Sequence, residues 1–121
     1  MRIIFDLMGT VFGALDMSLR PGIKETIEAL RENGCHVAFW TGGPVDQYKD
    51  RLKTSGISGE VYRKGLDTTY SPDICVDDSP EEWMPGRVFT VKPHLSDGDS
   101  GGFILAAELM NIDEKSDFFW D

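Results

Sequence analysis

The apolar residues of this chain form two patterns, short unbroken runs typical of buried strands and spaced positions typical of helices. The runs lie at residues 2–6, 35–40, 60–63, 74–76 and 88–91. Segments with helical spacing separate the first three of them. Strands that alternate with helices in so short a chain predict an α/β fold, a doubly wound and mostly parallel sheet of about five strands.

Two helices are predicted between these strands. The first covers residues 21–33 and begins at a Pro-Gly pair, and the second covers residues 44–55 and begins at a proline. Each carries one apolar stripe that can pack on the sheet. The stripes contain Ile23, Ile27 and Leu30 in the first helix, and Val45, Tyr48 and Leu52 in the second.

Three other segments have weaker patterns. Residues 9–20 have no helical period and predict a loop or a tight hairpin. Residues 79–83 predict a short capped helix, and residues 102–110 predict a last helix that is apolar on most sides and therefore largely buried. Because no internal repeat or linker interrupts the 121 residues, we expect a single domain over 1–121.

The charge of the chain restricts its partners. Twelve basic and 21 acidic side chains give a formal net charge of −9, which argues against nonspecific binding to nucleic acid or to anionic membranes. No segment approaches the ~20 apolar residues of a membrane span, and no cationic leader precedes an apolar stretch, so we expect a cytoplasmic protein. Cys35 and Cys75 lie inside apolar runs and are interpreted as core residues.

Polar side chains stand at the ends of successive predicted strands. They are Asp6, Thr41, Lys64 and the pair Asp77-Asp78. A parallel sheet brings such positions to one edge, where ligands bind. Each residue alone is typical of a cap, a turn or a solvated surface. Together they suit phosphoryl transfer, with a carboxylate nucleophile, a hydroxyl and an ammonium for the phosphate oxygens, and acids for Mg²⁺.

These residues resemble the motifs of the haloacid dehalogenase-like superfamily. Its first motif, D-x-D-G-T after an apolar strand, stands here as Asp6-Leu7-Met8-Gly9-Thr10. Thr41 matches the second motif and Asp77-Asp78 the acidic fourth, while Lys64 is the best candidate for the basic third, with Lys53 as an alternative. The resemblance implies a Rossmann-like three-layer sandwich and Mg²⁺-dependent transfer of a phosphoryl group to the first aspartate.

The resemblance also implies a role for each matching residue. Asp6 would be the nucleophile and a metal ligand, Asp78 the second acidic metal ligand, and Asp77 its support. The backbone carbonyl of Met8 would complete the protein's ligands to Mg²⁺. Thr41, Gly42 and Lys64 would hold the phosphate of a small phosphorylated molecule or of a macromolecular end.

Met8 replaces the acid that family phosphatases use to protonate the leaving group and to activate water. Since general acid–base catalysis typically contributes ~10²–10⁴-fold, its loss should slow ester hydrolysis while leaving the metal and phosphate sites formed. Three alternatives stay open: a changed reaction, a slow enzyme, or a catalytically inactive protein that binds a phosphorylated ligand or a protein partner. The Met8 side chain itself is interpreted as packing beside Phe12 or Trp40.

The resemblance implies an open site as well. Family caps are inserted after the first motif or after the second helix, and neither place holds an insertion here, so we expect no cap domain; an oligomer in which a second subunit covers the site is possible. The 93–102 loop is expected to cap the last helix at the rim, with His94 near a ligand. The acidic and aromatic segment 113–121 either docks on the domain or forms a partner motif.

Overall fold

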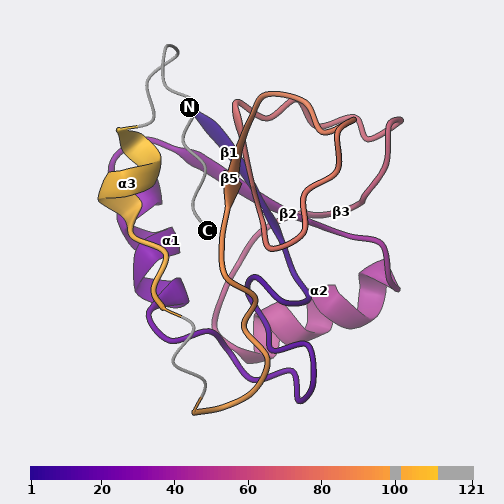
Figure 1. The fold of residues 1–121 in the computed structure, drawn as a ribbon, viewed down its shortest axis with the longest axis vertical. Coiled ribbons are helices and arrows are strands. Elements are labelled where there is room, and N and C mark those ends of the chain that lie inside the picture. Colours follow the sequence, from indigo (N-terminus) through magenta and orange to yellow (C-terminus); the bar gives the residue numbers. More distant parts are fainter. Residues whose placement is uncertain (99–101, 112–121) are drawn as a thin grey trace.

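The computed structural model describes residues 1–98 and 102–111 and contains five strands and three helices (Figure 1). In chain order they are β1 (Arg2–Asp6), α1 (Ile23–Glu32), β2 (His36–Thr41), α2 (Val45–Thr54), β3 (Val61–Arg63), β4 (Ile74–Asp77), β5 (Arg87–Thr90) and α3 (Ala106–Met110). The strands form one sheet of order β3-β2-β1-β4-β5, and each neighbouring pair is parallel. The predicted fold class, a small α/β Rossmann-like domain, is confirmed, and no cap domain stands among the described residues.

The strand order places β1 at the centre and creates a switch point beside it. The chain moves outward from β1 to β2 and β3, then returns to β4 on the other side of β1 and continues to β5. Where the direction of winding reverses, the connections on either side diverge and leave a crevice at the carboxyl ends of the strands. The switch point therefore lies between the ends of β1 and β4.

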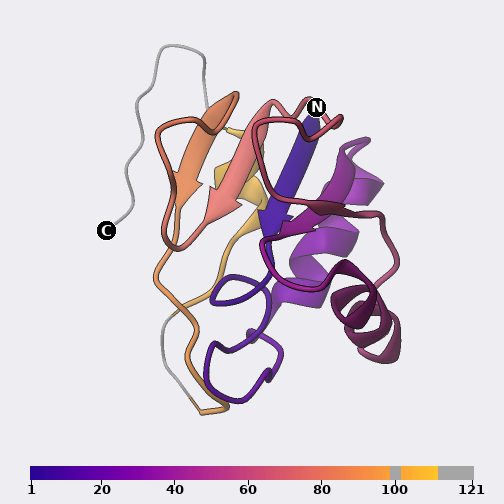
Figure 2. The same cartoon turned by 90° about the vertical axis from the view of Figure 1, so that its right-hand side faces the viewer.

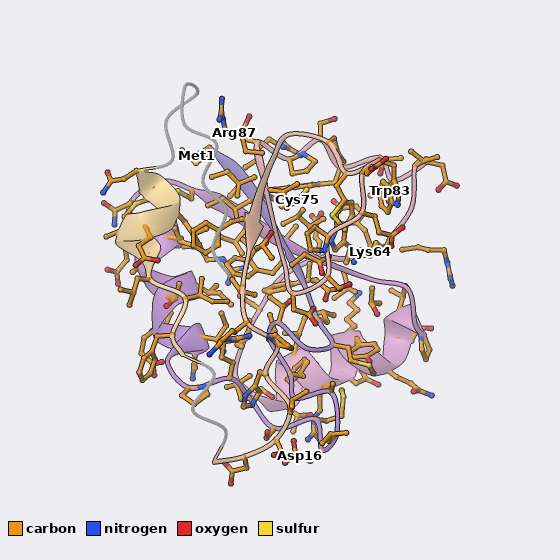
Figure 3. All side chains as sticks on the ribbon, in the orientation of Figure 1. Met1, Asp16, Lys64, Cys75, Trp83 and Arg87 are labelled. Atoms are coloured by element: carbon orange, nitrogen blue, oxygen red, sulfur yellow. The ribbon has the colours of Figure 1, made fainter. Side chains whose placement is uncertain are left out.

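The same reversal decides which face each connection covers. Right-handed crossovers place the two connections that link β1, β2 and β3 on one face of the sheet, and the connections from β3 to β4 and from β4 to β5 on the other. The three helices bury apolar side chains on the first face, in one cluster with Phe5 and Phe39. Figure 2 shows α3, in yellow, behind the strands, and in Figure 3 side chains fill the space between the helices and the strands. On the second face, Ile4, Trp40 and Cys75 pack under Tyr70 and Met84, which belong to the loops after β3 and β4. Loops rather than helices thus form the third layer of the sandwich.

The predicted helix at residues 79–83 is wrong, because this segment forms an extended loop with a turn. The Ser79 N–H donates to Asp77 Oδ1 at 2.8 Å, and the Trp83 ring packs against that of Trp40 with centroids 5.6 Å apart. A helix of five residues gains too few internal hydrogen bonds to compete with these contacts.

The last helix is shorter and more exposed than predicted. It begins at Ala106, since Gly102 has a left-handed backbone with φ of +98° and the Ile104 carbonyl accepts the Thr26 hydroxyl at 2.5 Å. Ile104 is buried, but Phe103 and Leu105 are 65% and 50% exposed, so the expected burial on most sides is wrong.

Other expectations concern the loops, the thiols and the tail. The 9–20 segment is a looped hairpin with isolated bridges from Phe12 to Met8 and to Leu19, as predicted. Cys35 and Cys75 are free and buried, as predicted. Among the described helices, none has both the length and the apolar character needed to cross a membrane. The 113–121 segment lies outside the described residues.

Candidate active site

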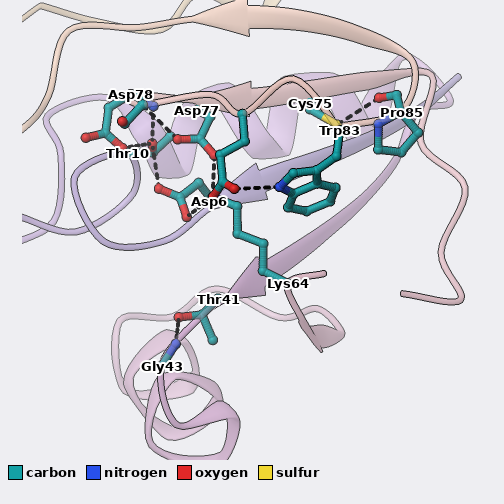
Figure 4. A network of polar contacts seen from close by, with 12 residues as sticks. Asp6, Thr10, Thr41, Gly43, Lys64, Cys75, Asp77, Asp78, Trp83 and Pro85 are labelled. Carbon is teal, nitrogen blue, oxygen red and sulfur yellow. Dashed lines mark hydrogen bonds and ion pairs between the residues drawn. The ribbon is translucent and has the colours of Figure 1, made fainter. Parts of the chain in front are cut away.

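Three carboxylates meet at the switch point of the sheet (Figure 4). Asp6 ends β1 and Asp77 ends β4, and the pairing of Phe5 with Val76 brings these two ends together. Asp78 follows Asp77, and one oxygen from each of the three carboxylates lies within 4.8 Å of the others. Asp6 and Asp77 are buried and Asp78 is half-buried. These hard oxygen ligands could hold a metal ion such as Mg²⁺.

Lys64 joins this cluster from the end of β3. Its Nζ lies 3.3 Å from Asp6 Oδ1 and 2.5 Å from Asp77 Oδ2. The backbone N–H of Lys64 donates to the Thr41 carbonyl at 2.9 Å, which fixes the start of the side chain beside β2. The alternative lysine, Lys53, is exposed on α2 and lines a separate surface hollow. The contacts with Asp6 and Asp77 therefore identify Lys64, rather than Lys53, as the basic residue beside the carboxylates.

Thr10 links the two acidic segments. Its Oγ1 lies 3.3 Å from Asp6 Oδ2 and 3.2 Å from Asp78 Oδ1, and it accepts the Asp78 N–H at 3.1 Å. The single hydroxyl proton can be donated to only one carboxylate at a time. Thr10 is fully buried and so holds both carboxylates in place. Thr10 stands in the first motif, but the sequence pattern indicated no separate role for it.

Gly9 allows the first loop to approach Asp78 closely. Its φ is +86°, in the left-handed region that glycine adopts without steric cost. A Cβ at this position would lie 2.5 Å from Asp78 Oδ2. Any larger residue would therefore displace the Asp78 carboxylate as well as strain the backbone.

Met8 lies at the surface rather than in the core. Its side chain is 48% exposed, whereas Phe12 and Trp40 are fully buried, so the expected packing of Met8 beside them is wrong. The reason is the turn that follows β1: the Leu7 carbonyl accepts the N–H groups of Val11 and Phe12, both at 2.9 Å, and the Gly9 N–H donates back to the Phe12 carbonyl. This winding buries Leu7 and turns Met8 outward.

Thr41 and Gly42 border the cluster from β2. Thr41 is buried, and its Oγ1 accepts the Gly43 N–H at 3.0 Å, which leaves the hydroxyl proton available to an oxygen of a ligand. Gly42 is exposed, and a Cβ built on it would have no neighbour within 4 Å. Among the described residues, Thr41 makes no hydrogen bond to the three carboxylates, so the two residues adjoin the cluster without joining it.

The charges of the cluster are strongly coupled. The pKa of Asp6 is raised to about 8, first by burial and then by the neighbouring charge of Asp77, while Lys64 opposes the shift. For Lys64, desolvation acts to lower the pKa, but the charges of Asp6 and Asp77 outweigh it, so the pKa lies above its ordinary value. When all four groups are ionised, three negative charges face one positive charge. A divalent cation would balance the excess.

Arg20 is a buried residue whose role the sequence did not indicate. Its guanidinium donates to the carbonyls of Thr10 at 2.6 Å, Gly9 at 3.1 Å and Gly102 at 3.0 Å, and also to that of Lys92. It therefore ties the loop after β1 to two segments that follow β5. An arginine directly before a Pro-Gly pair gives no sequence signal of burial, since such positions are usually exposed.

A polar network joins the 9–20 loop to the segment that follows β5. Asp16 accepts the Ser18 hydroxyl at 2.7 Å and the Asp97 N–H at 2.9 Å, and Ser18 Oγ lies 3.1 Å from His94 Nε2. His94 is buried, so its expected contact with a ligand is wrong. The expected capping of the last helix by the 93–102 loop is also wrong, because Leu105 precedes that helix and makes no side-chain cap.

Comparisons with known proteins identified no relative of this chain. No protein-family model, curated protein or solved structure matches the chain.

Proposed function

We propose that this protein is a Mg²⁺-dependent phosphohydrolase in which the Asp6 carboxylate takes the phosphoryl group from the substrate. One observation carries the proposal: a lysine contacts the central member of a three-carboxylate cluster at the switch point of a parallel sheet. Phosphate binding needs local positive charge on this acidic chain, and a metal ion beside Lys64 would provide it. The order of the motifs along the chain supports the same reading.

The carboxylates fit Mg²⁺ with little rearrangement. Ligand oxygens about 2.1 Å from one ion lie at most about 4.2 Å apart, and the oxygens here lie within 4.8 Å of one another. Asp77 already binds Lys64 and the Ser79 N–H, so Asp6 and Asp78 would be the direct ligands, together with the Met8 carbonyl. The bound ion would offset the repulsion between carboxylates and neutralise charge on the phosphate oxygens.

The chain's own residues account for the transfer. An oxygen of Asp6 forms a bond to phosphorus while the bond from phosphorus to the leaving oxygen breaks, and that oxygen takes its proton from water. Water then attacks the same phosphorus, the bond to the Asp6 oxygen breaks, and inorganic phosphate leaves. The Lys64 ammonium, the Thr41 hydroxyl and the Gly42 N–H hold the phosphate oxygens in both steps.

Met8 limits which substrates can react. A thioether neither protonates a leaving oxygen nor activates water, so substrates whose leaving groups need little protonation should react best. Slow turnover follows for the second step, in which water lacks a base. Met8 also favours a second candidate function, a protein that binds phosphorylated ligands in the presence of Mg²⁺ without turnover.

Hydrolysis of 4-nitrophenyl phosphate tests the proposal. We expect Mg²⁺-dependent turnover that Asp6→Asn lowers by more than ~10³-fold, while Asp50→Asn, which removes an exposed acid on α2, leaves it unchanged. Met8→Asp should raise turnover by ~10²-fold or more. Turnover that survives Asp6→Asn would exclude Asp6 as the nucleophile. Mg²⁺-dependent phosphate binding without turnover, even in Met8→Asp, would favour the binding protein.

A further inference from the structure

A recess opens beside the candidate site on the loop-covered face of the sheet. Its volume is about 90 Å³, and it lies between the loops that follow β3 and β4. Five of its seven lining residues are aromatic or apolar. The lining residues are Trp40, Gly65, Leu66, Thr68, Tyr70, Trp83 and Pro85.

The recess begins where the phosphate-binding residues end. Gly65 follows Lys64 directly, and Lys64 Nζ lies 5.9 Å from the centroid of the Trp40 ring and 3.3 Å from Asp6 Oδ1. Figure 3 places Trp83 on the same side of the molecule as Lys64. A substrate whose phosphate contacts Lys64 and Asp6 would therefore extend naturally toward Trp40 and Trp83.

The wall is suited to an apolar ring. Trp83 Nε1 already donates to Glu81 Oε2 at 2.5 Å, and the Thr68 hydroxyl donates to the Arg63 carbonyl at 2.5 Å, so both polar groups are engaged. Leu66 at the mouth is 82% exposed, an apolar side chain that a ligand would cover. The Trp40 and Trp83 rings are tilted by 60°, a geometry that offers an inserted ring both a face and an edge.

The size of the recess limits the ligand to one ring. A closed apolar cavity of about 150 Å³ holds benzene, and the recess here is about 90 Å³ but open on one side. The enclosed space is smaller than the cavity that holds benzene, so one aromatic ring would enter edge first and remain partly outside.

We propose that this recess receives the leaving group of the substrate and that the leaving group is a single aromatic ring, so that the substrate class is a monoaryl phosphate. This inference rests on the proposed function, in which Asp6 and Lys64 hold the phosphoryl group. It also agrees with the loss of the acid at Met8. A phenol with a pKa of about 10 leaves as its anion far more readily than an alkyl alcohol does.

Equilibrium binding to the full chain in Mg²⁺ tests the recess, with inorganic phosphate, ethyl phosphate and phenyl phosphate as probes. Tryptophan fluorescence of a Trp120→Phe background reports on Trp40 and Trp83, the two tryptophans that line the recess. We expect phenyl phosphate to bind ~10-fold more tightly than ethyl phosphate, because ring burial and stacking together contribute about one factor of ten.

Two variants and a control test whether the recess causes the tighter binding of phenyl phosphate. Leu66→Ala and Trp83→Leu should lower the preference for phenyl over ethyl phosphate several-fold and leave inorganic phosphate binding unchanged. Leu15→Ala removes another exposed leucine, on the 9–20 loop, and should change neither. Equal affinity for phenyl and ethyl phosphate, with inorganic phosphate still bound, would refute the aryl-binding role of the recess and leave the proposed function standing. Loss of Mg²⁺-dependent binding of all three probes overturns the proposed function and the recess together.

Discussion

The Lys64 ammonium lies 3.3 Å from the Asp6 carboxylate, although 58 residues separate them in the chain. The contact spans the sheet from the end of β3 to the end of β1, across the Trp40 ring of β2. Lys64 also binds Asp77 at 2.5 Å, so one cation bridges the carboxylates on both sides of the switch point. This bridge makes the electrostatic balance of the site dependent on a single side chain.

Replacing Lys64 by methionine should therefore destabilise the metal-free protein. Two buried carboxylates lose their counter-ion, and we expect the free energy of unfolding at pH 7 to fall by about 2 kcal/mol, below the full cost of a broken buried pair because Asp6 can take up a proton. Urea unfolding in a chelator measures the change. Lys53→Met, at an exposed position of α2, should stay within ~0.5 kcal/mol of wild type. Similar losses in the two variants would contradict the bridge.

The raised pKa of Asp6 predicts how stability depends on pH. The pKa is about 8 in the folded protein and about 4 in the unfolded chain. The folded state therefore binds the proton more tightly, and protonation of Asp6 stabilises it. This stabilisation is complete below pH 4 and is lost as the pH rises toward 8. The free energy of unfolding of the metal-free wild type should fall across this window relative to Asp6→Asn.

The comparison with Asp6→Asn isolates this carboxyl from the other titrating groups. We expect the variant to be at least ~1 kcal/mol more stable than wild type at pH 8 without metal, because it removes a buried charge. Saturating Mg²⁺ should reverse the order, since only the wild type retains this ligand. A difference between the two proteins that does not change with pH would show that Asp6 titrates normally.

Asp77 and Asp78 should differ in how they respond to substitution. Asp78→Asn is expected to remove most of the thermal stabilisation by Mg²⁺ while changing metal-free stability little, because Asp78 is half-buried and bonded to Thr10. Asp77→Asn should instead lower metal-free stability by more than ~1 kcal/mol, because Asp77 is buried against Lys64. Melting temperatures with and without Mg²⁺ separate the two cases. Identical behaviour of the two variants would refute the assignment of Asp78 as a metal ligand and of Asp77 as a supporting residue.

The sequence predicted the parallel sheet and the meeting of Asp6 with Asp77 and Asp78, because buried strands have continuous apolar runs and their polar ends share one edge. It could not predict features set by long-range contacts. The Arg20 guanidinium binds carbonyls from three separate segments, and no local pattern encodes that. The 79–83 segment has a capping pattern, but the contact of Trp83 with Trp40 decides its conformation.

Arg20 should be among the residues most sensitive to substitution. Lysine keeps the charge but lacks the planar fork that reaches several carbonyls at once, so Arg20→Lys leaves buried acceptors unpaired. We expect a loss of about 3 kcal/mol in the free energy of unfolding, with weaker Mg²⁺ binding because the Gly9 and Thr10 loop loosens. Arg51→Lys offers a matched exposed control, because the Arg51 guanidinium donates to a single carbonyl of the described residues, that of Met17 at 3.1 Å. Equal stability of the two variants would mean that Arg20 does not fasten the loop.

Gly9 and Gly34 allow backbone strain to be separated from contact with the site. Both have a left-handed φ, +86° and +85°, so alanine at either position incurs a similar strain of about 1 kcal/mol. A Cβ at Gly9 would also lie 2.5 Å from Asp78 Oδ2, whereas a Cβ at Gly34 would have no neighbour within 4 Å. Gly9→Ala should therefore cost at least ~1 kcal/mol more than Gly34→Ala and weaken Mg²⁺ binding, which Gly34→Ala should leave unchanged. Urea unfolding and Mg²⁺ titration of both variants measure the difference. If Gly9→Ala matched Gly34→Ala in both measurements, the carboxylate of Asp78 would not need the close approach of this loop, and its assignment as a metal ligand would lose its support.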